Sequence, residues 1–209
     1  MQKAIIYQML PRLWGNDRIK PKKNGGLSDN GTGKFSDIDN ASLEYIKWLG
    51  CSHVWYTGVI RHSTQASEAG CTPSHPQFVK GKAGSPYAIC DYYDVNAYLA
   101  DNAEDRMFEF EKLIKRTHNA GLKVIIDFVP NHVARDYGKV NMTPGHPVLG
   151  AEDDKSVHWR EENDFIYYPG ETLRLPTESP KGMKPYFEEP AMATGNNCYT
   201  PSPGINDWY

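Results

Sequence analysis

The chain has 209 residues, of which 39% are hydrophobic, and its 23 basic and 26 acidic side chains give a formal net charge of -3. This composition suits a protein with a buried core, and it excludes a disordered chain and a basic nucleic-acid-binding protein. No stretch approaches the roughly 20 apolar residues of a membrane span, and the first apolar run is too short for a signal peptide. We therefore expect a cytoplasmic protein with neither nucleic acid nor membrane as a partner.

Predicted strands and helices alternate through the first half of the chain. The apolar run 4–10 predicts a buried strand that ends at Pro11, and the Gly- and Lys-rich segment 16–34 predicts a loop. Apolar residues at helical spacing predict a helix over 40–49, and residues 53–56 predict a second strand.

A second helix and a third strand follow. Asn102 can cap this helix and Gly121 can end it. Its predicted apolar stripe consists of Met107, Phe110, Ile114 and Thr117. Residues 122–129 are nearly all apolar, which is typical of a parallel strand covered on both faces. This alternation is that of right-handed βαβ units, so the sequence predicts an α/β fold with a parallel sheet.

Two long segments interrupt the alternation, each at the carboxyl end of a strand, where α/β folds keep their sites. The first, 58–101, is predicted to be a loop. The second begins after Val133, has many aromatic residues and prolines, and predicts an irregular small β subdomain. The paired acids of this second segment, Asp153-Asp154 and Glu188-Glu189, are expected on a solvated face.

Four cysteines are too few for a disulfide scaffold, and none forms a Cys-x-x-Cys pair. We expect free thiols at Cys51, Cys71, Cys90 and Cys198.

Polar residues gather where the third strand ends, in Asp127-Phe128-Val129-Pro130-Asn131-His132. Acid, amide and imidazole groups at the mouth of a sheet can bind a ligand rich in hydroxyl groups. The same residues suit a purely structural role equally well, with Asp127 bonded to loop amides and His132 packed locally.

Two further segments, 31–56 and Ser85-Pro86-Tyr87 through Asp94, make the order and spacing resemble the opening third of the α-amylase family of glycoside hydrolases. The resemblance covers about residues 4–135. It implies that residues 1–133 are the first three strands of a TIM (β/α)8 barrel and that residues 134–209 are a subdomain inserted after strand 3.

The resemblance also implies roles for individual residues. His132 would hydrogen-bond sugar hydroxyls, Asp127 would brace that site, and Tyr87 would stack under the same sugar. Asn131 matches a position that holds calcium in many members. The implied substrate is an α-glucan such as starch or a maltooligosaccharide.

The two catalytic carboxylates of such retaining glycosidases are about 5 Å apart and come, in this family, from strands 4 and 5. No Gly-x-Arg-x-Asp motif follows His132. We therefore expect no catalytic residue within this chain and place the nucleophile and the acid/base beyond Tyr209. The alternatives are a non-catalytic carbohydrate-binding protein and a transglycosylating relative such as a trehalose synthase.

Overall fold

The centre of the fold is a three-stranded parallel sheet. In the computed structural model, which describes residues 3–18, 20–67, 70–139, 142–194 and 199–205, its strands in spatial order are β1 (Ile6–Met9), β2 (His53–Tyr56) and β5 (Lys123–Ile126). Val54 pairs with Tyr7 on one side and with Val124 on the other. The prediction of an α/β fold with a parallel sheet is confirmed, and each strand lies within its predicted range.

The predicted first helix is α2 (Asn40–Trp48). It begins where the Asp39 carboxylate accepts a hydrogen bond from the Ser42 amide at 2.8 Å, which satisfies one of the amides left free at a helix start. Leu43 and Ile46 are the buried residues of its inner face. No helix in the described ranges is both long enough and apolar enough to cross a membrane.

The predicted second helix is α3 (Arg106–Asn119), preceded by the 3-10 turn η3 (Ala103–Asp105). Asn102 caps the turn by accepting a hydrogen bond from the Glu104 amide at 3.2 Å. The buried residues of the helix are Phe110, Leu113 and Thr117. The prediction of a buried Met107 is wrong: this side chain is 41% exposed, because it stands in the first turn, at the surface beside Tyr93 and Pro144.

The long connection predicted as a loop contains two strands. β3 (Ile60–His62) pairs antiparallel with β4 (Ile89–Val95). The sequence pattern did not predict β4, because two of its seven residues, Asp91 and Asp94, are acidic and yet buried. The remaining short elements are α1 (Leu27–Asn30), η1 (Pro76–Phe78) and η2 (Ala97–Leu99).

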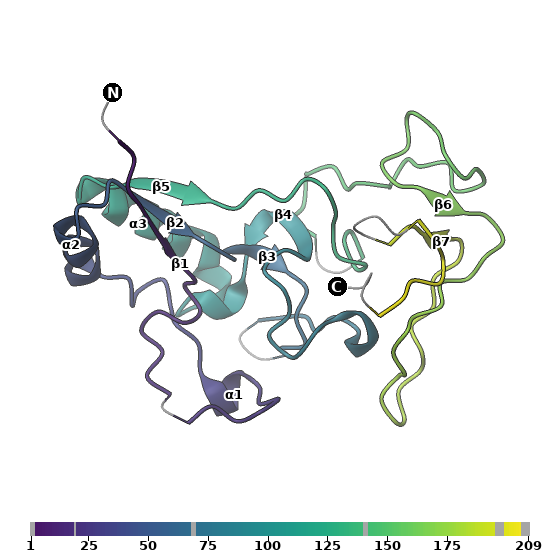
Figure 1. The fold of residues 1–209 in the computed structure, drawn as a ribbon, viewed down its shortest axis with the longest axis horizontal. Coiled ribbons are helices and arrows are strands. Elements are labelled where there is room, and N and C mark those ends of the chain that lie inside the picture. The colour runs from purple at the N-terminus through teal and green to yellow at the C-terminus, as the bar shows by residue number, and fades with distance from the viewer. Residues whose placement is uncertain (1–2, 19, 68–69, 140–141, 195–198, 206–209) are drawn as a thin grey trace.

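After Val133 the chain is mostly irregular. It holds one described antiparallel pair, formed by β6 (Tyr167–Tyr168) and β7 (Ala191–Met192). Figure 1 shows the parallel sheet with α2 and α3 at one end of the molecule, β6 and β7 at the other end, and β3 and β4 between them.

The later segment is bonded to the connection that holds β3 and β4. Gln77 Nε2 donates to the Thr177 carbonyl at 2.8 Å, and the Tyr186 amide donates to Gln77 Oε1 at 2.6 Å. Asp136 is buried and accepts hydrogen bonds from Ser74 and, at 3.3 Å, from the Cys90 thiol. These bonds join two segments that lie up to 109 residues apart in the chain.

The expectation that the paired acids are solvated is wrong for Glu188. Its carboxylate is buried and is bonded to Arg135, Lys139 and Tyr186, because the chain folds back on itself here and brings two cations to one acid. Glu189 is exposed as predicted. Asp153 and Asp154 are half-buried, since both accept hydrogen bonds from nearby backbone amides.

Strand β5 is not covered on both faces as predicted. It is an edge strand of the sheet, and the apolar side chains at its carboxyl end are exposed: Ile126 by 42% and Phe128 by 74%. The Phe128 ring lies 5.9 Å from the Tyr92 ring, centroid to centroid, but Ile126 and Phe128 both remain open to solvent, so the apolar pattern that predicted burial has no full covering layer here.

Candidate functional site

Asp127 directly follows β5 and links it to β2. Its Oδ1 accepts a hydrogen bond from Trp55 Nε1 at 2.8 Å, and its Oδ2 accepts one from the Gly58 amide at 3.1 Å. Trp55 lies in β2 and Gly58 just beyond its end. One carboxylate therefore holds together the carboxyl ends of two neighbouring parallel strands.

Tyr87 lies at the same end of the sheet, because the residue before it, Pro86, packs on Gly58. A Cβ at Gly58 would lie 3.0 Å from Pro86 Cβ, and Gly58 has a φ of +75°, so this position favours glycine on both counts. The Tyr87 side chain is 45% exposed, so an apolar ligand face can reach its ring.

His132 and Asn131 line a pocket of about 430 Å³, which we call the His132 pocket. Asn131 Nδ2 lies 3.3 Å from His132 Nδ1. The opposite wall comes from the segment that carries β6 and β7, with Asp164, Phe165 and Tyr199 among its side chains. The structure thus brings Asn131 and His132 together, whereas Tyr87 does not line this pocket.

A calcium ion at Asn131, which the resemblance implies, would need six to eight oxygen ligands. The side chains with oxygen in the His132 pocket are Asn131, Asp164, Thr194 and Tyr199, and Asp164 Oδ2 already accepts a hydrogen bond from the Gly150 amide at 2.7 Å. Among the described residues no three His, Cys, Asp or Glu side chains form a metal-binding group. Calcium also takes backbone carbonyl oxygens, so the site at Asn131 stays a prediction, and no step below uses a metal.

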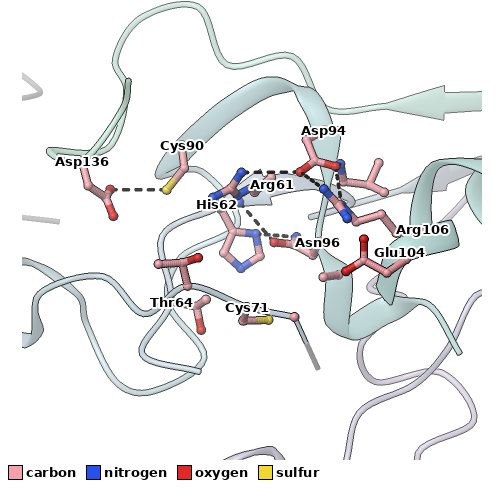
Figure 2. Close-up of a pocket in the computed structure, with 14 residues that line it drawn as sticks. Arg61, His62, Thr64, Cys71, Cys90, Asp94, Asn96, Glu104, Arg106 and Asp136 are labelled. Carbon is pink, nitrogen blue, oxygen red and sulfur yellow. Dashed lines mark hydrogen bonds and ion pairs between the residues drawn. The ribbon is translucent and has the colours of Figure 1, made fainter. Parts of the chain in front are cut away.

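A second pocket, of about 200 Å³, lies beside β3 and β4, and we call it the Asp94 pocket (Figure 2). Asp94 is buried between two arginines: Arg106 donates to both carboxylate oxygens at 2.7 and 3.0 Å, and Arg61 Nη1 lies 3.5 Å from Oδ2. The hydrogen bond from Arg106 to Asp94 raises the pKa of the Arg106 guanidinium. The arginine charges of this pocket are therefore balanced from within.

Two other titratable groups of the Asp94 pocket, His62 and Cys90, are held in neutral forms. Burial lowers the pKa of His62 to about 4, with a smaller contribution from the charge of Arg12. Asn96 Nδ2 lies 2.9 Å from His62 Nδ1, as Figure 2 shows. Burial, and then the charge of Asp136, raise the pKa of the Cys90 thiol. A neutral buried imidazole and a protonated thiol favour a structural role for this pocket.

The cysteines were predicted correctly where the structure describes them. Cys51, Cys71 and Cys90 are free thiols, and Cys198 lies outside the described residues.

Sequence reasoning missed the partners that place the predicted site residues. The sequence predicts Trp55 only as a strand residue, although its indole N–H donates a hydrogen bond to Asp127. Asp164, Phe165 and Tyr199 reach the His132 pocket from an irregular segment with no periodic pattern, so no signal in the sequence pointed to them.

Comparison with known proteins confirms the family resemblance. A family model described as the catalytic domain of alpha amylase matches residues 22–197. An alpha-glucosidase from Pediococcus pentosaceus is 25% identical over 136 residues, and trehalose-6-phosphate hydrolase from Bacillus subtilis is 27% identical over 136 residues. Each match covers 65% of this chain and only 18% of the relative's length. A solved alpha-amylase from Lactobacillus plantarum is 26% identical, with a TM-score of 0.44 over 64% of this chain and 24% of its own. Because the family model matches most of the chain, the protein belongs to the α-amylase family of glycosidases.

Proposed function

We propose that residues 1–133 are the first three strands of a TIM (β/α)8 barrel, that residues 134–209 are the subdomain inserted after strand 3, and that both form the sugar-binding side of a retaining α-glucan glycosidase. In this proposal Tyr87 stacks on the sugar at the cleavage site, His132 donates hydrogen bonds to its hydroxyl groups, and Asp127 holds the two loops that carry them.

The observation that carries the proposal is the double hydrogen bond of Asp127. It fixes the end of β5, five residues before His132, to Gly58, on which Pro86 and the Tyr87 loop pack. A pyranose offers an apolar face to an aromatic ring and a rim of hydroxyls to imidazole and carboxylate groups. A frame that holds these groups at one end of a parallel sheet suits this ligand.

The catalytic carboxylates belong to the proposal as well. A retaining glycosidase needs a nucleophile and an acid/base about 5 Å apart, and the reaction passes through a covalent glycosyl intermediate. We place both outside residues 1–209, because no Gly-x-Arg-x-Asp motif follows His132. Residues 1–209 alone should therefore leave maltooligosaccharides unhydrolysed.

The test is the hydrolysis of maltooligosaccharides by a protein that contains these residues together with the rest of the barrel. Tyr87→Ala and His132→Ala should each lower kcat/KM at least about tenfold, the scale of one stacking or hydrogen-bonding contact in the transition state. Tyr45→Ala and His118→Ala change exposed residues on α2 and α3 and should leave kcat/KM unchanged.

Each possible outcome has a definite reading. Wild-type kinetics in both site variants would overturn the proposed roles, and no turnover by the complete protein would favour a carbohydrate-binding protein without activity. Product analysis that shows transferred rather than hydrolysed glucosyl units would identify a transglycosylating enzyme.

A further inference from the structure

A third pocket, of about 510 Å³, lies away from the residues assigned above. We call it the Arg12 pocket. One wall is the segment 12–32 that follows β1, and the other is formed by residues 64–67 and 82–83 with Tyr98. It shares no lining residue with the His132 pocket. Its volume is that of a pocket for a small organic ligand.

The ionisable side chains that line this pocket, besides the Tyr98 phenol, are all cationic: Arg12, Arg18 and Lys82. No Asp or Glu lines the pocket, and none of the three cations forms an ion pair within the described part of the chain. The arginines of the Asp94 pocket, by contrast, share a buried carboxylate (Figure 2).

The nearby acid Asp29 does not neutralise these charges. Its carboxylate accepts hydrogen bonds from Lys22 Nζ and the Gly26 amide, both at 3.1 Å. These two bonds, and to a smaller extent the charge of Lys82, lower the pKa of Asp29. Its charge is thus already compensated outside the pocket.

Arg12 contributes a buried nitrogen to the pocket region, although its side chain also interacts with the Tyr98 hydroxyl. Its Nη1 is buried and has no hydrogen-bond partner in the described structure, and it is the one buried side-chain nitrogen or oxygen there in this condition. The Arg12 charge interacts with His62 and Tyr98, and both of these side chains are neutral. Burial lowers the pKa of His62 to about 4 and raises that of Tyr98 to about 12. A partly buried guanidinium without an anion is costly, and an anionic ligand removes that cost.

The backbone of Arg18 is held at the edge of the pocket. The stem of its side chain crosses Gly31, where a Cβ would come within 3.0 Å of Arg18 Cγ, and Gly31 has a φ of +67°. Asn16 Oδ1 accepts a hydrogen bond from the Arg18 backbone amide at 3.3 Å, and Asn16 Nδ2 donates one to the Asn30 carbonyl at 3.0 Å. The backbone that carries Arg18 is therefore anchored at the rim, while its side chain is exposed and reachable by a ligand.

We propose that the Arg12 pocket binds a phosphate group, with Arg12, Arg18 and Lys82 as its ligands. Arginine forks match phosphate oxygens two at a time, and lysine adds a point charge. A pocket of 510 Å³ is much larger than a phosphate ion, so the space beyond the cations takes the hydroxyl-bearing part of a small phosphorylated sugar. Lys82 and Ala83 lead directly into the Tyr87 loop, but the proposal rests on the pocket alone and stands whether or not the protein hydrolyses α-glucans.

The test is calorimetric titration of the intact chain with inorganic phosphate, glucose 6-phosphate and glucose. Both phosphates should bind and glucose should not bind to this pocket, and added NaCl should weaken the binding of both. Arg18→Gln and Lys82→Gln each remove one charge-assisted contact from an exposed position and should raise the Kd about tenfold. Lys23→Gln makes the same charge change in the same loop, outside the pocket lining, and should leave the Kd unchanged.

The two phosphate ligands separate the possible sources of the group. Tighter binding of glucose 6-phosphate than of inorganic phosphate assigns the pocket to a sugar phosphate, whereas equal binding assigns it to free phosphate. The proposal is overturned if neither ligand binds at millimolar concentration, or if both variants bind as tightly as the wild type.

Discussion

Arg135 and Glu188 lie 53 residues apart in the chain and form an ion pair with 2.8 Å between Nη1 and Oε1. Both side chains are almost fully buried. Glu188 also accepts hydrogen bonds from the Met192 amide at 2.9 Å and from the Tyr186 hydroxyl at 2.9 Å. Arg135 donates in turn to the carbonyls of Met192 and Ala193 at 3.0 Å. One buried pair therefore connects the segment after β5 to strand β7.

This pair predicts a large difference between two adjacent glutamates. Glu188→Gln should destabilise the protein by about 3 kcal/mol, since it removes the buried carboxylate charge that pairs with the buried Arg135 guanidinium and with Lys139. Urea unfolding at neutral pH measures the loss. Glu189→Gln is the matched control, because Glu189 is exposed, and it should change the stability little. Equal effects of the two changes would contradict the role assigned to Arg135 and Glu188.

The Asp127 bond to Trp55 predicts a coupling between strands β2 and β5. Trp55→Phe keeps an aromatic ring in β2 but removes the indole N–H that donates to Asp127, which should cost on the order of 1 kcal/mol. Asp127→Ala should cost more, because it also frees the Gly58 amide.

A double-mutant cycle by urea unfolding isolates the contact between these two side chains. The double variant Trp55→Phe/Asp127→Ala should be more stable than the sum of the two single changes implies, because the shared hydrogen bond can be lost only once. Strictly additive effects would show that the Trp55 bond contributes nothing to stability.

Burial of His62 predicts a loss of stability in acid. Its pKa is about 4 in the folded protein and near 6.5 in the unfolded chain, so between these pH values the unfolded chain binds a proton that the folded protein excludes. Stability should therefore fall as the pH drops from about 6.5 to 4, by a total on the order of 3 kcal/mol, and level off below that.

The measurement compares urea unfolding of the wild type and of His62→Gln at pH 7 and pH 5. The variant should be less stable at pH 7, since His62 lies within hydrogen-bonding distance of Asn96 and Tyr98, but it should lose less stability on acidification. Exposed His118 provides the control, because His118→Gln should keep the wild-type pH dependence. Parallel pH profiles for wild type and His62→Gln would refute this assignment.

Sequence patterns predicted the parts of the fold that depend on local periodicity. The β1, β2 and β5 strands and the two helices follow from apolar spacing and from the Asn102 cap. The patterns failed where a long-range partner decides the structure. Strand β4 buries the charged residues Asp91 and Asp94 because both have long-range partners. The Thr143 hydroxyl donates a hydrogen bond to Asp91, and two arginines form ion pairs with Asp94.

The candidate site shows the same division. Tyr87, Asp127 and His132 were predicted as site residues from a motif order that a single sequence displays, and these roles stay predictions. The wall that Asp164 and Tyr199 give to the His132 pocket depends on an irregular chain path. The Arg12 pocket could not be predicted at all, because Lys82 lies 64 residues from Arg18 and 70 residues from Arg12, with no pattern that connects them.

The exposed edge of β5 predicts that residues 1–209 associate in solution. An edge strand offers unpaired backbone groups, and the exposed side chains of Ile126 and Phe128 lose roughly 1.5–3 kcal/mol of burial each when they remain in water. We expect size-exclusion chromatography with light scattering to show a mass that rises with concentration, and Phe128→Lys should lower it by placing a charge on the edge. Phe187→Lys is the control, because this phenylalanine is 68% exposed but follows no strand of the parallel sheet. If the wild type stays monomeric at every concentration, or if both variants lower the mass equally, β5 is not the surface through which the chains associate.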